Sequence, residues 1–110
     1  MAGRRLIAAV ALALVVAGCG GSGVSDDERD RAVAAAQSAY DRAVERGDDL
    51  ARGPCIAEAL PELSDWVADV AHDPRADVDD DPDNQCLRYR KGEASHFVEL
   101  SPAGQLIRAE

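Results

Sequence analysis

The sequence has few aromatic residues and almost no lysine. Trp, Tyr and Phe make up 4% of its 110 residues, and a single lysine accompanies eleven arginines. After the first five residues there is no dense basic cluster, and the formal net charge is −9. Such a chain repels a phosphate backbone, which excludes nucleic acid as a partner. At this length the apolar residues can form the core of at most one domain.

No hydrophobic run is long enough to span a bilayer. The longest is Leu6–Ala17, which has twelve residues and no charge, whereas a transmembrane helix needs about twenty. Arg4 and Arg5 precede this run, so the beginning of the chain has the order of a signal peptide. We therefore expect residues 1–18 to be removed from the mature protein.

The end of this segment carries a recognisable pattern. Val16-Ala17-Gly18-Cys19 resembles the lipobox of bacterial lipoproteins, in which an aliphatic and two small residues precede the cysteine that is lipidated. The resemblance covers the first nineteen residues and implies a diacylglyceryl thioether on Cys19. Two or three acyl chains such as palmitate, at about 0.8 kcal/mol per buried methylene, hold a protein persistently on a membrane. An ordinary secretory signal and an uncleaved anchor are the alternatives.

The expected mature chain divides into a tether and a domain. Residues 19–27 contain the lipidated cysteine and a stretch rich in glycine, serine and aspartate, which predicts a flexible tether. Residues 28–110 form the small folded domain. From residue 19 onward the formal charge is −11, and such a surface avoids anionic head groups. We expect a location on the extracytoplasmic face of the cell membrane, held there by the lipid on Cys19.

Two cysteines remain in the predicted domain, Cys55 and Cys86. An even number in a small exported domain is typical of a disulfide. Closing a loop of about 32 residues stabilises a fold by about 3.7 kcal/mol in the chain-entropy model, a large contribution for so small a core. The alternative is a pair of free thiols that bind a metal, although they have no paired neighbours in the sequence.

Two helices are predicted in the first half of the domain. Ser25 and Glu28 have the spacing of a capping box, so the first helix is expected from about Asp26 to Ala51, with Gly47 as an earlier end. Its apolar stripe consists of Val33, Ala36, Tyr40, Ala43 and Val44.

The second helix is predicted between Pro54 and Val70, where apolar residues recur at three- and four-residue steps. Pro61 interrupts the register, which predicts either a kink or a helix that begins at this proline. Trp66, the largest apolar side chain, is interpreted as a core anchor and not as a platform for a ligand.

The end of the chain has the alternation of three short strands, around Leu87–Arg90, Ser95–Leu100 and Gln105–Ala109. In the middle strand, neither face is wholly apolar. The sequence therefore predicts an α+β fold in which two helices pack on a small three-stranded antiparallel sheet, stapled by one disulfide.

The acidic segment 77–83 suggests a second kind of site. Asp77, Asp79 and Asp81 have the spacing that begins an EF-hand loop, but Pro82 and Arg88 stand where that loop needs a glycine and a glutamate. A solvated acidic loop is the favoured interpretation. The alternative is a looser calcium site, whose ligands would be Asp77, Asp79, Asp81 and Asp83.

Catalytic motifs are not apparent. His72 and His96 lie far apart in the sequence, and neither Ser95 nor Ser101 lies in a nucleophile turn. The domain is therefore expected to be non-enzymatic and to need no cofactor. We expect a binding or accessory domain of the cell envelope, whose partner is an envelope protein or a wall component. The alternative function is a calcium- or small-ligand-binding module centred on the segment 77–83.

Overall fold

The first helix begins directly after its capping serine. The computed structural model describes residues 23–110, and α1 spans Asp26–Arg46. The Ser25 side chain accepts a hydrogen bond from the Glu28 backbone N–H at 3.0 Å, which satisfies one of the free donors at the helix start. The helix ends at Gly47, whose φ of 81° lies in the left-handed region that glycine tolerates. The predicted start is confirmed, and the end is the earlier of the two expected.

The buried face of α1 is lined with small side chains. Its buried residues are Ala32, Ala36, Ala39 and Ala43. Val44, which the helical spacing places on the apolar stripe, is 51% exposed. Because alanine adds nothing beyond Cβ, the helix backbone lies close to the sheet, and the bulk of the core comes from other segments. The largest fully buried side chains are Trp66, Leu60, Leu100, Val67, Val70 and Val98.

The sheet has four strands in the order β1-β2-β3-β4. They span Cys55–Ala57, Trp66–Val70, His96–Leu100 and Leu106–Ala109. β1 is antiparallel to β2, and β3 is antiparallel to β4, whereas β2 and β3 are parallel. The fold is α+β with one disulfide, as predicted, but the sheet is mixed and has one strand more than expected.

The predicted helix between Pro54 and Val70 is wrong. Apart from a turn with a bridge between Leu60 and Leu63, this stretch forms β1 and β2. Layers cover β2 on both faces, and Trp66, Val67, Ala68 and Val70 are all buried. A strand buried on both faces has a nearly continuous apolar sequence, whose spacing also fits a helix.

The predicted strand at Leu87–Arg90 is also wrong, because these residues form the single helical turn α2. The chain leaves β2, crosses the sheet through residues 71–95 and returns parallel to it as β3. A parallel pair needs such a crossover of a dozen or more residues. This connection makes the sheet mixed instead of antiparallel.

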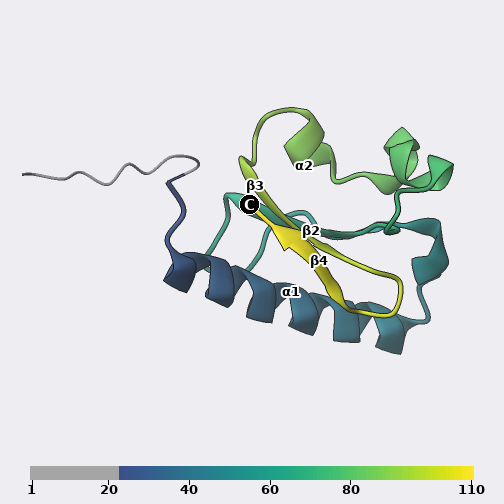
Figure 1. The fold of residues 1–110 in the computed structure, drawn as a ribbon, viewed down its shortest axis with the longest axis horizontal. Coiled ribbons are helices and arrows are strands. Elements are labelled where there is room, and N and C mark those ends of the chain that lie inside the picture. Colours follow the sequence, from purple (N-terminus) through teal and green to yellow (C-terminus); the bar gives the residue numbers. More distant parts are fainter. Residues whose placement is uncertain (1–22) are drawn as a thin grey trace, which may run out of the picture.

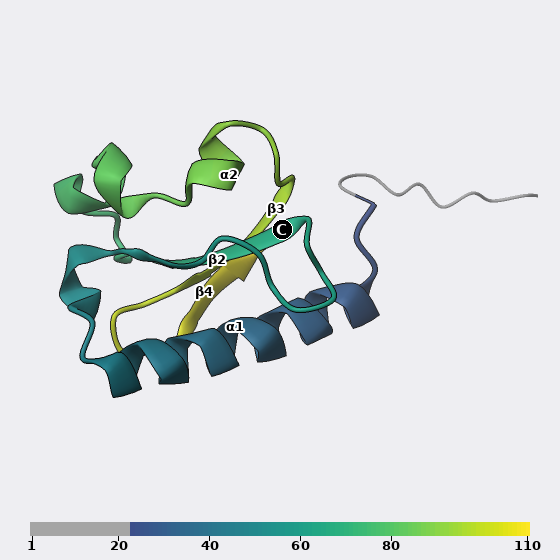
Figure 2. The same cartoon turned by 180° about the vertical axis from the view of Figure 1, so that it is seen from behind.

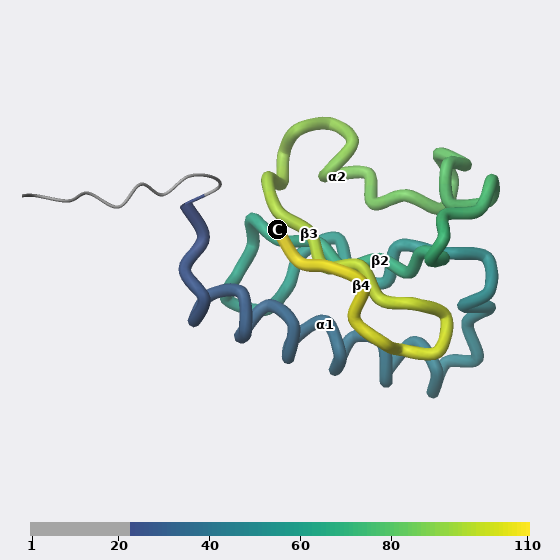
Figure 3. The backbone as a smooth tube through the Cα atoms, viewed as in Figure 1, coloured from purple at the N-terminus to yellow at the C-terminus, as the bar shows by residue number. Residues whose placement is uncertain are grey.

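Two layers sandwich the sheet (Figure 1). On one face α1 packs against Trp66, Ala68, Val98 and Leu100 through its alanines. The opposite face carries the crossover, which consists of η2 (Asp77–Asp80), η3 (Pro82–Asn84) and α2, as the reverse view shows (Figure 2). The tube drawing follows this crossover away from β2 and back into β3 (Figure 3). A short helical turn, η1 (Leu50–Arg52), links α1 to β1.

Trp66 is a core residue, as predicted, with 0% of its surface exposed. Its indole Nε1 donates a hydrogen bond to Glu28 Oε2 at 2.8 Å. The glutamate that was expected to complete the capping box therefore binds the sheet. This contact fixes the beginning of α1 against the beginning of β2.

Candidate functional site

The predicted disulfide is confirmed. Cys55 on β1 is bonded to Cys86, the residue that precedes α2. The Glu58 carboxylate strengthens the same connection, because it accepts hydrogen bonds from the backbone N–H groups of Leu87 and Arg88 at 2.8 and 2.9 Å. The two sulfurs are used in the bond, so the alternative of two thiols that bind a metal does not hold. The bridge instead fixes α2 over the sheet.

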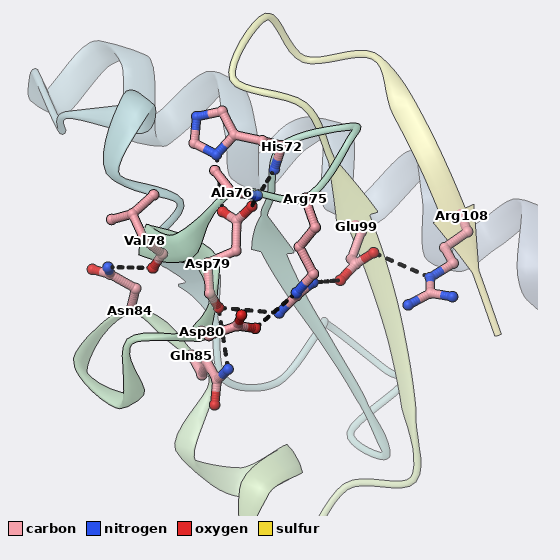
Figure 4. Close-up of polar contacts among 10 residues, drawn as sticks. All are labelled: His72, Arg75, Ala76, Val78, Asp79, Asp80, Asn84, Gln85, Glu99 and Arg108. Atoms are coloured by element: carbon pink, nitrogen blue, oxygen red, sulfur yellow. Dashed lines mark hydrogen bonds and ion pairs between the residues drawn. The ribbon is translucent and has the colours of Figure 1, made fainter.

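The acidic segment 77–83 folds inward at Asp79, whose side chain is 1% exposed. Its carboxylate accepts hydrogen bonds from the backbone N–H groups of His72 and Ala76, each at 2.9 Å. The second oxygen lies 2.9 Å from His72 Nδ1. Figure 4 shows the Asp79 carboxylate beside His72 and Ala76. Burial by itself would raise the pKa of Asp79, but the hydrogen bonds from Ala76 and His72 outweigh it and hold this pKa below its ordinary value of 3.8. Asp79 is therefore a structural centre of the crossover.

The remaining aspartates of this segment do not join Asp79. Asp81 caps η3 by accepting from the Asp83 backbone N–H at 3.0 Å. Within residues 23–110, the four aspartates proposed as calcium ligands do not meet in a group that could hold a metal ion.

The histidines and serines considered for catalysis are dispersed as well. His72 is bonded to Asp79, whereas His96 stacks on Trp66 with ring centroids 4.9 Å apart. His96 Nε2 also lies 3.5 Å from an oxygen of Asp65. The Ser101 hydroxyl accepts hydrogen bonds from two backbone N–H groups in the turn after β3. The structure does not bring these groups together as a nucleophile and a base.

A cleft of about 480 Å³ opens between the crossover and the sheet. Its floor consists of side chains from the three strands β2, β3 and β4, and its walls belong to the crossover. The volume lies within the range of sites for small ligands. The residues that line it are Val67, Asp69, Arg75, Gln85, Cys86, Tyr89, Arg90, Phe97, Glu99 and Arg108.

Two carboxylates lie side by side on the floor. Asp69 and Glu99 are register partners on the parallel strands β2 and β3, so their side chains leave the same face of the sheet. Within residues 23–110, Asp69 Oδ1 is buried and has no hydrogen-bond partner. Burial, together with the charge of Glu99, raises the pKa of Asp69 to about 7 from 3.8. This carboxyl therefore changes its protonation state close to neutral pH.

Glu99, in contrast, is fully paired. It is 8% exposed, and its oxygens accept from Arg108 Nε at 3.1 Å and from Arg75 Nη1 at 3.4 Å. Figure 4 shows the two guanidiniums approaching Glu99 from opposite sides. Arg75 also donates to Asp80 Oδ1 at 2.9 Å and to the Asp79 carbonyl at 3.0 Å. The floor thus places a carboxylate paired with two guanidiniums beside one whose Oδ1 has no hydrogen-bond partner within residues 23–110.

Aromatic rings and a third guanidinium form another part of the lining. Tyr89 meets Phe97 edge to face with centroids 5.2 Å apart. The Arg108 guanidinium lies 5.2 Å above the Phe97 ring, which is within the range of a cation–π interaction. In the part of the chain that the structure describes, the side chain of Arg90 has no hydrogen bond or ion pair. Arg90 is exposed and belongs to the same cleft.

The pair of carboxylates was missed in the sequence because any two of its 21 acidic residues could be paired at will. A signal was present, however. β2 reads WVADV and β3 reads HFVEL, so each five-residue strand has a single acid at its fourth position. An acid inside a buried strand is unusual, and the shared position would have aligned the two once the strands were paired.

The predicted lipidation site Cys19 and the predicted signal peptide lie outside the described residues. No helix found in residues 23–110 has both the length and the apolar character required to cross a membrane. Comparison with protein-family models, with curated proteins and with solved structures finds no match to this chain.

Proposed function

We propose that the chain is a lipid-anchored extracytoplasmic lipoprotein whose folded domain binds a small polar component of the cell envelope without catalysing a reaction. The anchor is supported by the sequence Val16-Ala17-Gly18-Cys19 and by the charged and apolar segments that precede it. The predicted tether connects Cys19 to α1, which begins at Asp26, so its last two residues, Asp26 and Asp27, belong to the helix.

The binding function is inferred from one observation, which is the cleft with the unpartnered Oδ1 of Asp69 at its floor. A buried polar atom without a hydrogen bond costs the fold about 1–3 kcal/mol. Its retention inside a cleft of ligand size indicates a group that is satisfied by something outside the chain. The disulfide and the Asp79 contacts hold the crossover walls in place, so the site is formed before a ligand arrives.

Binding is favoured over catalysis because the described cleft has no nucleophile with an adjacent base. His96 leaves β3 toward α1, on the opposite face of the sheet from the cleft, where it stacks on Trp66. His72 is held by Asp79. The calcium module centred on the segment 77–83 is less well supported, because its aspartates diverge and Asp79 is used internally.

The anchor is tested by the intact mass of the protein extracted from membranes of its host, before and after reduction with alkylation. We expect a mass that begins at Cys19 and includes two or three acyl chains, with two cysteines that are labelled only after reduction. An unlipidated mass would refute the anchor and indicate a freely secreted domain.

The binding function is tested by native mass spectrometry of the same protein after equilibration with a size-filtered extract of the host envelope. Wild type should retain a small non-covalent adduct, and so should the control Asp41→Asn, which removes an exposed carboxylate from α1. The variant Asp69→Asn should lose most of it. Absence of any adduct, or an adduct of equal occupancy in all three proteins, would overturn the assignment of the cleft. Millimolar calcium should leave the melting temperature unchanged, whereas a clear rise would restore the calcium module.

A further inference from the structure

Two polar groups of opposite charge in the cleft have no side-chain partner within residues 23–110. One is the Asp69 carboxyl, whose Oδ1 is buried without a hydrogen bond in the described part of the chain. The other is the Arg90 guanidinium, which within residues 23–110 makes no hydrogen bond or ion pair. The other acidic group of the floor, Glu99, is already neutralised by Arg75 and Arg108. The vacant positions are therefore one for a cation and one for an anion.

These two groups come from different layers of the fold. Asp69 is on β2 at the floor of the cleft, and Arg90 is the last residue of α2 in the crossover. A molecule that contacts both must extend from the sheet toward the crossover. The volume of about 480 Å³ accommodates an amino acid or a short peptide.

On the basis of the proposed function, we propose that the cleft binds a small zwitterion, with its ammonium group against Asp69 and its carboxylate against Arg90. An ammonium group donates three hydrogen bonds and supplies a cationic partner for the Asp69 carboxylate. A guanidinium binds a carboxylate through two parallel hydrogen bonds. The rings of Tyr89 and Phe97 line the same cleft and provide an apolar surface for the rest of the ligand.

Ligands of a single charge fit less well. A simple anion would bind Arg90 but leave Asp69 Oδ1 buried without a hydrogen bond. A simple cation would satisfy Asp69 but would meet three guanidiniums in the same cleft. A neutral polyol would donate hydrogen bonds but would not compensate either charge. A zwitterion satisfies both vacant positions and adds no net charge.

The site also couples binding to pH. The charged groups that face Asp69 are Glu99 on β3, Arg108 on β4, and Arg75 and Asp79 in the crossover. With the pKa of Asp69 at about 7 in the free protein, an ammonium that binds the ionised form must displace a proton below that pH. The affinity should therefore fall by up to roughly tenfold for each pH unit below 7.

The experiment is an amide NMR titration of the isotope-labelled protein, purified from membranes, with four probes. Glycylglycine is the zwitterion, N-acetyl-glycylglycine lacks the ammonium, glycylglycine amide lacks the carboxylate, and glucose is the neutral polyol. We expect glycylglycine to shift the resonances of β2, β3 and α2, with an affinity at least about tenfold higher than that of either blocked peptide. This advantage should shrink as the pH is lowered from 7.5 to 5.5.

Two variants assign the ends of the ligand. Asp69→Asn should abolish the preference for glycylglycine over its N-acetyl form, and Arg90→Gln should abolish the preference over the amide. The controls are Asp41→Asn and Arg42→Gln, which change the same charges on the exposed face of α1. Because the Arg90 side chain is exposed and makes no hydrogen bond or ion pair within residues 23–110, Arg90→Gln tests the proposal independently of any change in stability caused by Asp69→Asn.

The outcomes separate the two proposals. Equal affinity for glycylglycine, a blocked peptide and glucose overturns the zwitterion but leaves a binding cleft. The same holds if none of the four probes binds while the envelope extract yields an adduct that depends on Asp69. If neither the probes nor the extract yields binding, both the zwitterion and the binding function are overturned.

Discussion

Replacement of Asp69 by asparagine should stabilise the domain at neutral and alkaline pH. The pKa of this carboxyl is raised by burial and by Glu99 to about 7, whereas its ordinary value is 3.8. The folded state therefore binds the proton more tightly than the unfolded state. The stabilisation that this proton gives is complete below pH 4 and is lost as the pH rises from 4 to 7. At 1.36 kcal/mol for each pKa unit, the loss amounts to about 4 kcal/mol.

Asparagine has the same shape and no charge, so it removes this loss. We expect Asp69→Asn to exceed wild type in the free energy of unfolding by up to about 4 kcal/mol at pH 8, with the difference closing toward pH 4. Urea denaturation of both proteins at five pH values between 4 and 8 measures it. The control Asp41→Asn removes one negative charge from the same acidic chain.

The comparison of the variant with wild type is essential, because the pKa of Asp79 shifts in the opposite direction. Asp79 has a lowered pKa, and its contribution to stability is present above pH 4 and is lost as the pH falls through its folded-state pKa. This contribution is common to both proteins and cancels in the difference. A difference independent of pH, or a variant less stable than wild type at pH 8, would refute the electrostatic account of the cleft.

Two further changes probe the frame of the site. Replacing both Cys55 and Cys86 by serine should lower the free energy of unfolding by about 3–4 kcal/mol in urea denaturation; a loss below about 1 kcal/mol would contradict the entropic estimate. Gly104→Ala should lower it by about 1–3 kcal/mol, because Gly104 has φ of 89° and an added Cβ would lie 2.8 Å from the ring of Tyr40. Gly92→Ala is the matched control, since Gly92 has φ of 76° but no atom within 4 Å; an equal loss in both variants would show that the ring contact is unimportant.

The parts of the fold that rest on local rules could be predicted from the sequence. The serine cap and the glycine end of α1 act within a few residues. The strands near residues 96–100 and 105–109 have clear turns beside them. The disulfide followed from the number of cysteines in the domain and did not require their geometry.

The parts of the fold that depend on long-range pairing could not be predicted from the sequence. Whether the apolar run before Val70 forms a helix or a strand is decided by the layers that cover it, and those come from distant segments. The parallel pairing of β2 and β3 is likewise a property of the crossover as a whole. The cleft depends on that pairing, because Asp69 and Glu99 are thirty positions apart and meet only in this register.

The position of the beginning of α1 has a consequence for how the domain would stand on a membrane. Asp26 lies at one end of the helix and Gly47 at the other, about 30 Å away at 1.5 Å per residue. The acidic turns η2 and η3 lie toward the Gly47 end in both views (Figures 1 and 2). In a chain held through its amino-terminal tether, the Asp26 end of α1 would therefore lie nearer the membrane and the Gly47 end farther from it. The acidic turns η2 and η3 would then point away from anionic lipid head groups and toward the surface that the domain faces.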